Sequence, residues 1–237
     1  MLEIGGERLQ HIAIIMDGNR RWARRKGWAA KQGYEAGVET LKKTIKWCCE
    51  MELLHLTVYV FSTENWLRAT DEVEDLMFLI CDSFAKYAKE AKENNVRISV
   101  WGRKERLSAE LINIIERIKN DTKDCTGLNL NLCFNYGGRQ EIVDAVHVIA
   151  QDLIDGNLRL CDVTAEALAK KMYASTAPDP DLIVRSGGEC RLSNFLSWQC
   201  IYSELVFLDV LWPDFAKDDL ELAVAEFYKR KRRFGGR

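Results

Sequence analysis

The sequence predicts a single α/β domain, residues 1–237, with a central, mainly parallel sheet of six strands surrounded by helices. Six short apolar runs have the composition of strands, and stretches with helical periodicity lie between most of them. Such alternation is typical of a parallel sheet wrapped by helices. The chain contains only three prolines and has no internal repeat or linker-like segment, and 237 residues suffice for one such domain.

The elements follow one another along the chain in a regular order. Strands are expected at 11–16, 54–61, 97–101, 128–134, 182–185 and 204–210. Helices are expected at 32–52, 72–94, 106–120, 139–155, 164–173 and 217–231. Side chains alternate between the two faces of a strand, so the fourth run carries two different faces. One face consists of Leu128, Leu130, Leu132 and Phe134, and the other of Asn129, Asn131 and Cys133.

The composition narrows the possible functions. A hydrophobic fraction of 47%, a charged fraction of 30% and a net charge of −2 indicate an ordinary soluble surface, and argue against a general nucleic-acid binder. No apolar run approaches the roughly 20 residues that span a bilayer, and the N-terminus does not resemble a signal peptide. The eight cysteines form no CxxC pair, so we expect buried, reduced thiols in a reducing compartment.

Three polar segments follow expected strands, namely MDGNRRW, FSTENW and RSGGECRLSN after the first, second and fifth. Ligands of open parallel sheets collect at the carboxyl ends of the strands, where these segments would meet. No GxxxxGK[ST] loop, GxGxxG fingerprint or DDxxD motif occurs. A candidate site is therefore expected at this edge, without an ordinary nucleotide-binding loop.

The first segment combines one carboxylate with several guanidinium groups. Asp17-Gly18-Asn19 can form a tight turn, and the helix after it would present its first N–H groups to an anion. Four arginines in this helix suit phosphate oxygens: Arg20, Arg21, Arg24 and Arg25. Asp17 beside a diphosphate is the kind of ligand that Mg²⁺ uses. The alternative, an N-capping aspartate on a solvated basic helix, remains open at this point.

Two further segments add to the candidate site. In RSGGECRLSNF, two glycines allow close backbone approach, while Arg185, Arg191 and Ser193 can converge on an anion. In FSTENWLR, polar residues stand beside aromatic ones: Ser62, Asn65 and Arg68 beside Phe61 and Trp66. This pairing fits a ligand with a charged head and an apolar body. The three histidines, His11, His55 and His147, have no partner at useful spacing and are interpreted as structural.

Several long motifs resemble one family. HIAIIMDGNRRWA, FSTENWLR, LNLNLCFNYGGR, DLIVRSGGECRLSNFLSWQCIYSE and FLDVLWPDF are similar, in the same order, to the cis-prenyltransferases of the undecaprenyl diphosphate synthase family. The resemblance implies a dimer that condenses isopentenyl diphosphate with an allylic diphosphate, using Mg²⁺ and no redox cofactor. It also implies an apolar tunnel between the sheet and two helices, here the helix before the second strand and 72–94.

The resemblance also implies roles for individual residues. Asp17 would bind Mg²⁺, and Gly18, Asn19, Arg20, Arg21 and Trp22 form the segment that holds the allylic diphosphate. Isopentenyl diphosphate would be bound by Arg185, Arg191 and Ser193, with Glu204 supporting the metal from the partner subunit. Phe61, Ser62, Asn65, Trp66 and Arg68 would shape the reacting centre, where Ser62 and Asn65 assist proton removal. The C-terminal KRKRRFGGR, by itself a solvated tail, contains an RxG element, Arg233 to Gly235, that would reach the partner's isopentenyl diphosphate.

Two departures from the family pattern affect substrate handling. Ala30 and Tyr34 stand where an arginine and a histidine usually attend the allylic diphosphate, and tyrosine supplies no cation at neutral pH. Phe134, on the same face as the tunnel-lining position Leu128, is expected to stop chain growth, which predicts a product of about ten to twenty carbons. The alternative is that Phe134 packs away from the tunnel.

The departures leave a second enzyme reading open. An irregular, lavandulyl-type prenyltransferase would couple two dimethylallyl diphosphates. A non-catalytic partner subunit is disfavoured, because Asp17 and both anion clusters are present together. We expect no nucleic-acid partner, at most peripheral membrane contact, and a cytoplasmic location, or an organelle stroma if a transit segment was removed.

Overall fold

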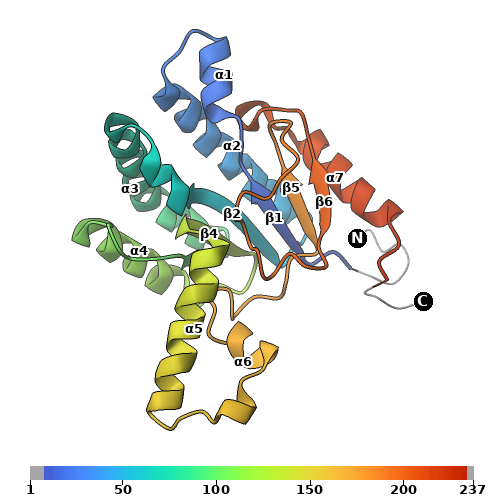
Figure 1. Cartoon of the computed structure of the whole chain (residues 1–237). Helices are drawn as coiled ribbons and strands as arrows, with labels where there is room; N and C mark the ends of the chain where they lie inside the picture. Colours follow the sequence, from blue (N-terminus) through green and yellow to red (C-terminus); the bar gives the residue numbers. More distant parts are fainter. Residues whose placement is uncertain (1–7, 234–237) are drawn as a thin grey trace.

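The expected six-stranded sheet is present in the computed structural model, which describes residues 8–233 (Figure 1). All neighbouring strands are parallel, in the order β3-β4-β2-β1-β5-β6. The strands are β1 (His11–Ile15), β2 (His55–Ser62), β3 (Arg97–Trp101), β4 (Asn129–Tyr136), β5 (Leu182–Arg185) and β6 (Glu204–Phe207). The apolar runs therefore predicted every strand, and the topology gathers their carboxyl ends at one edge.

Seven α-helices surround the sheet within the described residues. They are α1 (Asn19–Arg25), α2 (Ala30–Glu50), α3 (Thr70–Glu93), α4 (Ala109–Thr122), α5 (Gly138–Ile154), α6 (Ala165–Ala169) and α7 (Lys217–Lys229). Short 3-10 turns cover Thr63–Leu67, Leu160–Asp162 and Trp212–Asp214. The expected helices agree within a few residues, with one exception. The helix expected at 164–173 ends at Ala169, because the chain then tightens into turns.

The last strand also ends earlier than expected. It stops at Phe207 instead of continuing to residue 210. Beyond Phe207 the backbone forms hydrogen bonds with the loop after β5. The N–H groups of Gly187 and Gly188 donate to the carbonyls of Val210 and Leu208. This pairing holds the loop after β5 against the segment after β6.

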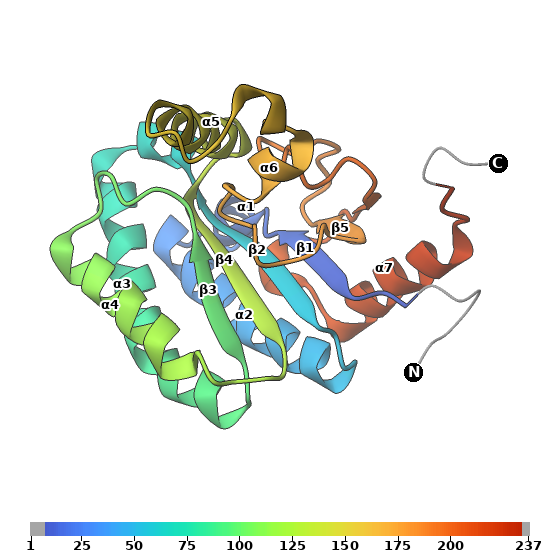
Figure 2. The same ribbon diagram turned by 90° about the horizontal axis from the view of Figure 1, so that it is seen from below.

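The two faces of the sheet have separate cores. Helices α2, α3, α4 and α7 cover one face, and α5, α6 and the segments 172–177 and 192–200 lie on the other (Figure 2). The first core is aliphatic and contains Leu56, Val58 and Leu132. The second core contains Phe195 and Tyr136, which pack against the strand side chains that point to the opposite face of the sheet. Both faces are thus buried, as is usual for a parallel sheet.

A row of buried hydrogen-bonded polar groups crosses the strands near the amino end of β1, away from the edge that carries the strands' carboxyl ends. The His11 Nδ1–H donates to the Pro178 carbonyl at 2.7 Å, and His11 Nε2 accepts from the Thr57 hydroxyl at 2.7 Å. Asn131 Nδ2 donates to the same hydroxyl oxygen at 3.0 Å. Burial lowers the pKa of His11 to about 4, so the ring is neutral at pH 7. These contacts agree with the structural role expected for His11.

The cysteines agree only in part with their predicted burial. All eight are free thiols, and Cys48, Cys125 and Cys133 are buried as expected. The prediction is wrong for Cys161 and Cys190, which are exposed because they lie in a short turn and a loop. In the part of the chain covered by the structure, no helix combines the length and apolarity needed to cross a membrane.

Candidate active site

The candidate site begins at the turn between β1 and α1. Gly18 has a φ of +113°, and a Cβ there would lie 2.9 Å from the Leu211 side chain. A side chain at this position would be both strained and crowded, so glycine lets the chain reverse direction directly after Asp17. The Trp212 N–H donates to the Asp17 carbonyl at 2.9 Å, which fixes the turn against the segment after β6.

The Asp17 carboxylate joins the first and fifth strand ends. Its Oδ2 accepts from Arg185 Nη2 at 2.9 Å, and its Oδ1 lies 3.2 Å from Arg21 Nη2. The Arg185 side chain is only 5% exposed and also donates to the Ser193 hydroxyl at 2.9 Å. The expected convergence of these two segments is therefore present. Arg185 acts as a buried support for Asp17 and Ser193.

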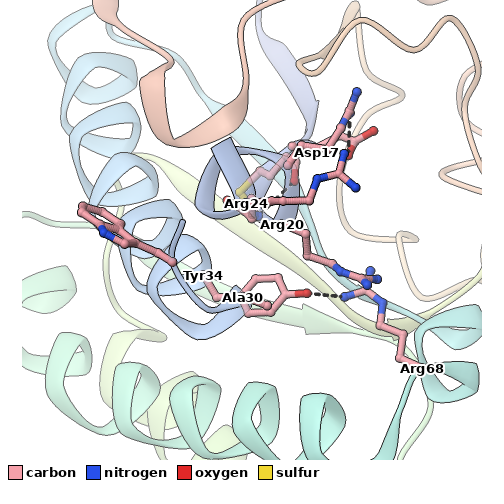
Figure 3. A pocket seen from close by; sticks show the side chains of 11 residues that line it. Asp17, Arg20, Arg24, Ala30, Tyr34 and Arg68 are labelled. Atoms are coloured by element: carbon pink, nitrogen blue, oxygen red, sulfur yellow. Dashed lines mark hydrogen bonds and ion pairs between the residues drawn. The ribbon is translucent and has the colours of Figure 1, made fainter. Parts of the chain in front are cut away.

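An open pocket of about 510 Å³ lies beside Asp17 and is rich in guanidinium groups (Figure 3). Its wall residues come from the turn after β1, from α1, from the segment between α1 and α2, from α2 and from the segment before α3: Met16, Asp17, Gly18, Asn19, Arg20, Arg21, Arg24, Trp28, Ala30, Tyr34 and Arg68. We call this the arginine pocket. Such a concentration of guanidinium groups around one carboxylate suits a multiply charged anion such as a diphosphate.

Several expected ligands lie outside this wall. Trp22 is buried beneath α1, and its indole N–H donates to Asp214 Oδ1 at 2.6 Å. Trp28, which sequence analysis did not select, is half-exposed and takes the place at the rim. Arg191 is exposed and pairs with Glu189 at 2.5 Å. Trp22 was expected to face the substrate, and this prediction is wrong because helical geometry turns its side chain inward toward Leu211.

Two glycines of α2 allow α1 to approach α2 closely beside the arginine pocket. A Cβ at Gly33 would lie 2.2 Å from the Asn19 carbonyl oxygen, and one at Gly37 would lie 2.4 Å from Asn19 Oδ1. Asn19 Oδ1 is buried without a hydrogen-bond partner among the described residues. The i,i+4 spacing of the two glycines inside a helix was the available sequence signal, since glycine in a helix is otherwise unfavourable.

Tyr34 and Arg68 meet at the inner wall of the pocket. The Tyr34 hydroxyl accepts from Arg68 Nη1 at 3.0 Å (Figure 3). It also donates to Glu72 Oε1 at 2.6 Å. Arg68 Nη1 also donates to Glu72 Oε1 at 3.1 Å, and Arg20 lies 3.6 Å from the same carboxylate. Burial, together with the hydrogen bond to Glu72, raises the pKa of Tyr34, so the phenol remains neutral. Sequence analysis did not select Glu72.

An apolar cavity of about 110 Å³ lies deeper, between α2, α3 and the sheet. Val38, Leu41 and Ile45 line it from α2, and Ile80, Phe84 and Tyr87 line it from α3. This is the region in which the family resemblance places a tunnel. A further pocket of about 340 Å³ continues from it toward the ends of both helices, near Lys46 and Asn94.

Leu128 and Phe134 are buried on the same side of the sheet as this cavity. Leu128 precedes β4 and packs in the aliphatic core. Phe134 packs between Phe61 and Phe84, with ring centroids 5.8 and 6.1 Å away. Among the described wall residues, the cavity includes Phe84 but neither Leu128 nor Phe134. Phe134 therefore packs behind the wall residue Phe84 and does not itself line the cavity.

The segment after β2 is organised by its own side chains. Asn65 Oδ1 accepts from the Ser62 N–H at 3.0 Å and caps the turn. The Trp66 indole donates to Asn135 Oδ1 at 2.7 Å, and its ring contacts Phe61 edge-on at 5.0 Å. Of the FSTENWLR residues within the described chain, Arg68 alone reaches the arginine pocket wall.

The same segment contacts the loop that carries Ser193. Asn194 Nδ2 donates to Glu64 Oε1 at 2.8 Å. Burial would raise the pKa of Glu64, but hydrogen bonds from Asn194 and neighbouring groups outweigh it and lower that pKa. Tyr59, on β2, donates to the Tyr136 carbonyl at 3.2 Å and stacks on Phe195. These contacts link the second and fifth strand ends.

The remaining predicted residues lie far from Asp17 within one chain. Glu204 begins β6, opposite the Arg185 end of the parallel strands, and Arg230 Nη1 donates to it at 2.8 Å. Arg233 is exposed, and Gly235 lies outside the described residues. Residues 8–233 contain no group of three carboxylate, histidine or cysteine side chains arranged to hold a metal. One carboxylate facing a phosphate-sized pocket is instead the arrangement in which Mg²⁺ uses substrate oxygens as ligands.

Residues 15–235 match the prenyltransferase family described as putative undecaprenyl diphosphate synthase. The chain belongs to this family. An isoprenyl transferase of Streptococcus mutans is 49% identical over 230 residues, covering 95% of this chain and 92% of the relative. In Pyrococcus abyssi, a tritrans,polycis-undecaprenyl-diphosphate synthase (geranylgeranyl-diphosphate specific) is 45% identical over 228 residues, covering 95% and 86%.

Solved structures of this family have the same fold. Lavandulyl diphosphate synthase from Lavandula x intermedia, in complex with dimethylallyl diphosphate, superimposes with a TM-score of 0.91 at 33% identity, covering 95% of this chain and 98% of that one. A probable undecaprenyl diphosphate synthase from Campylobacter jejuni gives a TM-score of 0.80 at 33% identity, covering 97% and 99%. Family membership extends over nearly the whole chain and agrees with the resemblance seen in its motifs.

Proposed function

We propose that the protein is a cis-prenyltransferase that condenses isopentenyl diphosphate with an allylic diphosphate. The observation that carries this proposal is the arginine pocket, which has Asp17 in its wall and an apolar cavity beyond its inner side. A substrate with a charged head and a hydrocarbon tail needs both regions. Family membership supplies the reaction class.

In this reaction the allylic carbon–oxygen bond breaks, a new carbon–carbon bond forms to isopentenyl diphosphate, and a proton leaves the product. The departing diphosphate gains negative charge as the bond breaks. Arg20, Arg21, Arg24 and Arg68 are already positioned around the pocket, so they stabilise this charge with little rearrangement. Ser62 ends β2 and Asn65 follows it, and we propose that these two residues assist proton removal. The Asn65 Oδ1 accepts a hydrogen bond from the Ser62 N–H.

Mg²⁺ fits this site as a shared ligand of protein and substrate. Asp17 would hold it together with diphosphate oxygens, and the bound ion would supply Lewis-acid stabilisation of the leaving group. Arg185 and Arg21 hold the Asp17 carboxylate in place at the edge of the pocket. These two contacts orient the carboxylate toward one side of the site.

We also propose that the active species is a homodimer located in the cytoplasm. Asp17 and Glu204 lie at opposite ends of the strands, so a second copy is needed if Glu204 and Arg233 serve the same reaction. The two curated relatives named above come from a bacterium and an archaeon, and the composition is that of an ordinary soluble chain, which favours the cytoplasm. Arg185, Arg191 and Ser193 would then bind isopentenyl diphosphate near the interface between the two copies.

The small apolar cavity favours a short product. Its volume is about 110 Å³. Phe84 lies in its wall, and the Phe134 and Phe61 rings pack behind Phe84. Close packing leaves little room for chain growth unless side chains move. We therefore retain the proposal of a product of about ten to twenty carbons.

Irregular coupling of two dimethylallyl diphosphates is the second candidate. The observations in its favour are the lavandulyl diphosphate synthase relative, with a TM-score of 0.91, and the uncharged Ala30 and Tyr34 at the inner pocket wall. The match to isoprenyl transferases is at least as strong, with 49% identity to the Streptococcus mutans protein. The regular reaction is therefore the main proposal.

A product assay distinguishes the two. Purified protein with Mg²⁺ is incubated with dimethylallyl, geranyl or farnesyl diphosphate, each with and without isopentenyl diphosphate. A linear cis product that requires isopentenyl diphosphate is the expected result. A branched product from dimethylallyl diphosphate alone would replace the main proposal by the second, and no product under any condition would overturn both.

A further inference from the structure

We infer that Tyr34 and Glu72 are specificity-determining residues, because their hydrogen bond closes the passage between the arginine pocket and the apolar cavity. The inference rests on the proposed function, since it concerns how an allylic substrate would place its tail. A long tail would require the Tyr34 hydroxyl to move away from Glu72.

The passage follows one face of α2. Ala30 and Tyr34 line the arginine pocket, and Val38, Leu41 and Ile45 line the apolar cavity. Positions separated by three or four residues share a helix face, so these side chains form one continuous row. The two cavities thus lie along the same surface of α2, and Tyr34 is the last pocket residue before the cavity.

The Tyr34 ring lines the arginine pocket and packs against residues on the side of the apolar cavity. It is only 9% exposed and belongs to a buried cluster with Leu76, Ile80, Phe61 and Phe134. Ile80 lines the apolar cavity directly, so the cluster connects the two walls. A hydrocarbon tail that extends from the arginine pocket into the cavity must displace part of this cluster.

The Tyr34 hydroxyl fastens the ring to α3. Its donation to Glu72 at 2.6 Å joins the two helices on either side of the passage. The Glu72 side chain is 13% exposed and is also approached by Arg68 at 3.1 Å and Arg20 at 3.6 Å. A neutral donor bound to a partly buried carboxylate forms a strong hydrogen bond, so rotating the ring is costly.

The same carboxylate holds two guanidinium groups of the arginine pocket. Glu72 competes with a diphosphate for Arg20 and Arg68, since both cations can face either anion. Head-group binding and closure of the passage are therefore coupled through Glu72. A short tail can bind with the passage closed, whereas a long tail requires the hydroxyl to leave the carboxylate.

The test measures binding without turnover. Non-hydrolysable thiolo analogues of dimethylallyl and farnesyl diphosphate are titrated calorimetrically against the wild type, Tyr34→Phe, Glu72→Ala and the double variant. Tyr34→Phe removes one oxygen and retains the ring. It should shift the affinity ratio toward the farnesyl analogue by about tenfold, the scale of one charge-assisted hydrogen bond.

The other variants isolate the link. Glu72→Ala should shift the ratio in the same direction and also strengthen binding of both analogues, because Arg20 and Arg68 lose a competing anion. The double variant should shift the ratio no further than either single variant, since both remove the same hydrogen bond. Additive shifts would mean that the two residues act separately and would overturn the inference.

Tyr173→Phe provides the matched control. Its hydroxyl donates to Asp144, which is paired with Arg103, so a tyrosine, a carboxylate and an arginine also meet at the other face of the sheet. The ratio should not change in this variant. An unchanged ratio in Tyr34→Phe would overturn the inference while leaving the proposed reaction intact. Failure of both analogues to bind the wild type would overturn the diphosphate pocket itself, and the inference with it.

Discussion

The Asp17 carboxylate and the buried Arg185 guanidinium meet at 2.9 Å, although the two residues are 168 positions apart in the sequence. Arg185 ends β5 and Asp17 follows β1, so the contact depends on the pairing of these two strands. A charge that is buried with its partner loses much more when the partner is removed than an exposed charge does. The contact therefore serves both the site and the fold.

Replacing Asp17 separates these two contributions. Asp17→Ala should lower turnover at least about a hundredfold, the loss typical of one preorganised electrostatic group. It should also lower the melting temperature, because Arg185 is left buried without its carboxylate. Asp17→Asn should lose turnover with a smaller change in melting temperature. Asp218→Asn, on the outer helix α7, is the control. Near-normal turnover in Asp17→Ala would contradict the metal assignment.

Mixing two inactive variants tests the role of Glu204. Asp17→Asn and Glu204→Gln chains are denatured together and refolded in equal amounts. If Glu204 serves the partner's site, each mixed dimer contains one complete site, and about a quarter of wild-type activity returns. If Glu204 instead acts within its own chain, no mixed dimer has a complete site. Activity that stays at the level of the separate variants would therefore contradict the proposal that Glu204 serves the partner's site.

Gly37→Ala tests the close approach of α1 to α2. The new Cβ would lie 2.4 Å from Asn19 Oδ1, so Asn19 must move away from the pocket floor. We expect the affinity for an allylic diphosphate analogue to fall about tenfold, with only a small change in the free energy of unfolding, because alanine favours the helix. Lys43→Ala, on the exposed side of the same helix, is the control. Unchanged affinity would show that Asn19 does not position the ligand.

Phe134→Leu tests the limit on product length. The smaller side chain opens space between Phe61 and Phe84, so the mean product should become longer by one or more isoprene units. Product length is measured by mass spectrometry after hydrolysis of the diphosphate. Phe227→Leu removes the same volume from the core beneath α7 and should leave the length distribution unchanged. An unchanged distribution in Phe134→Leu would place the limit elsewhere.

The buried His11 predicts a pH dependence of stability. Its folded-state pKa is about 4, below the ordinary value of 6.5, so the unfolded chain binds the proton more readily between these values. The contribution is complete above about pH 6.5 and is lost progressively as the pH falls toward 4, by up to about 3 kcal/mol.

Urea unfolding between pH 4 and 7 measures this dependence. His11→Gln should be less stable at pH 7, yet its stability should fall less steeply as the pH decreases. His147→Gln, at an exposed position of α5, should retain the wild-type slope. Equal slopes in all three proteins would show that His11 does not carry the dependence.

Much of the fold could be predicted from local patterns. Apolar runs located each strand, and polar residues directly after three of them located the edge that bears the site. These signals are contained in neighbouring residues, which is why they were readable. Arg185 was also correctly assigned to this edge, but its burial was not foreseen, because burial depends on the loop that folds over it.

The parts that could not be predicted depend on contacts distant in sequence. Tyr34 and Glu72 are 38 positions apart, and nothing in either neighbourhood indicates that they bond. Trp22 lies within the first basic motif and Trp28 follows it, and only the packing of α1 determines which is buried. Gly33 and Gly37 did carry a local signal, since two helical glycines one turn apart often mark a close contact.

The pocket at the far end of α2 and α3 gives the molecule a second opening. It shares Lys42, Ile45, Tyr87, Ile98 and Leu130 with the apolar cavity, and exposed Lys46 and Asn94 lie at its border. A tail of about ten to twenty carbons would end inside this route, and only a longer lipid would bring its tip to the border formed by Lys46 and Asn94.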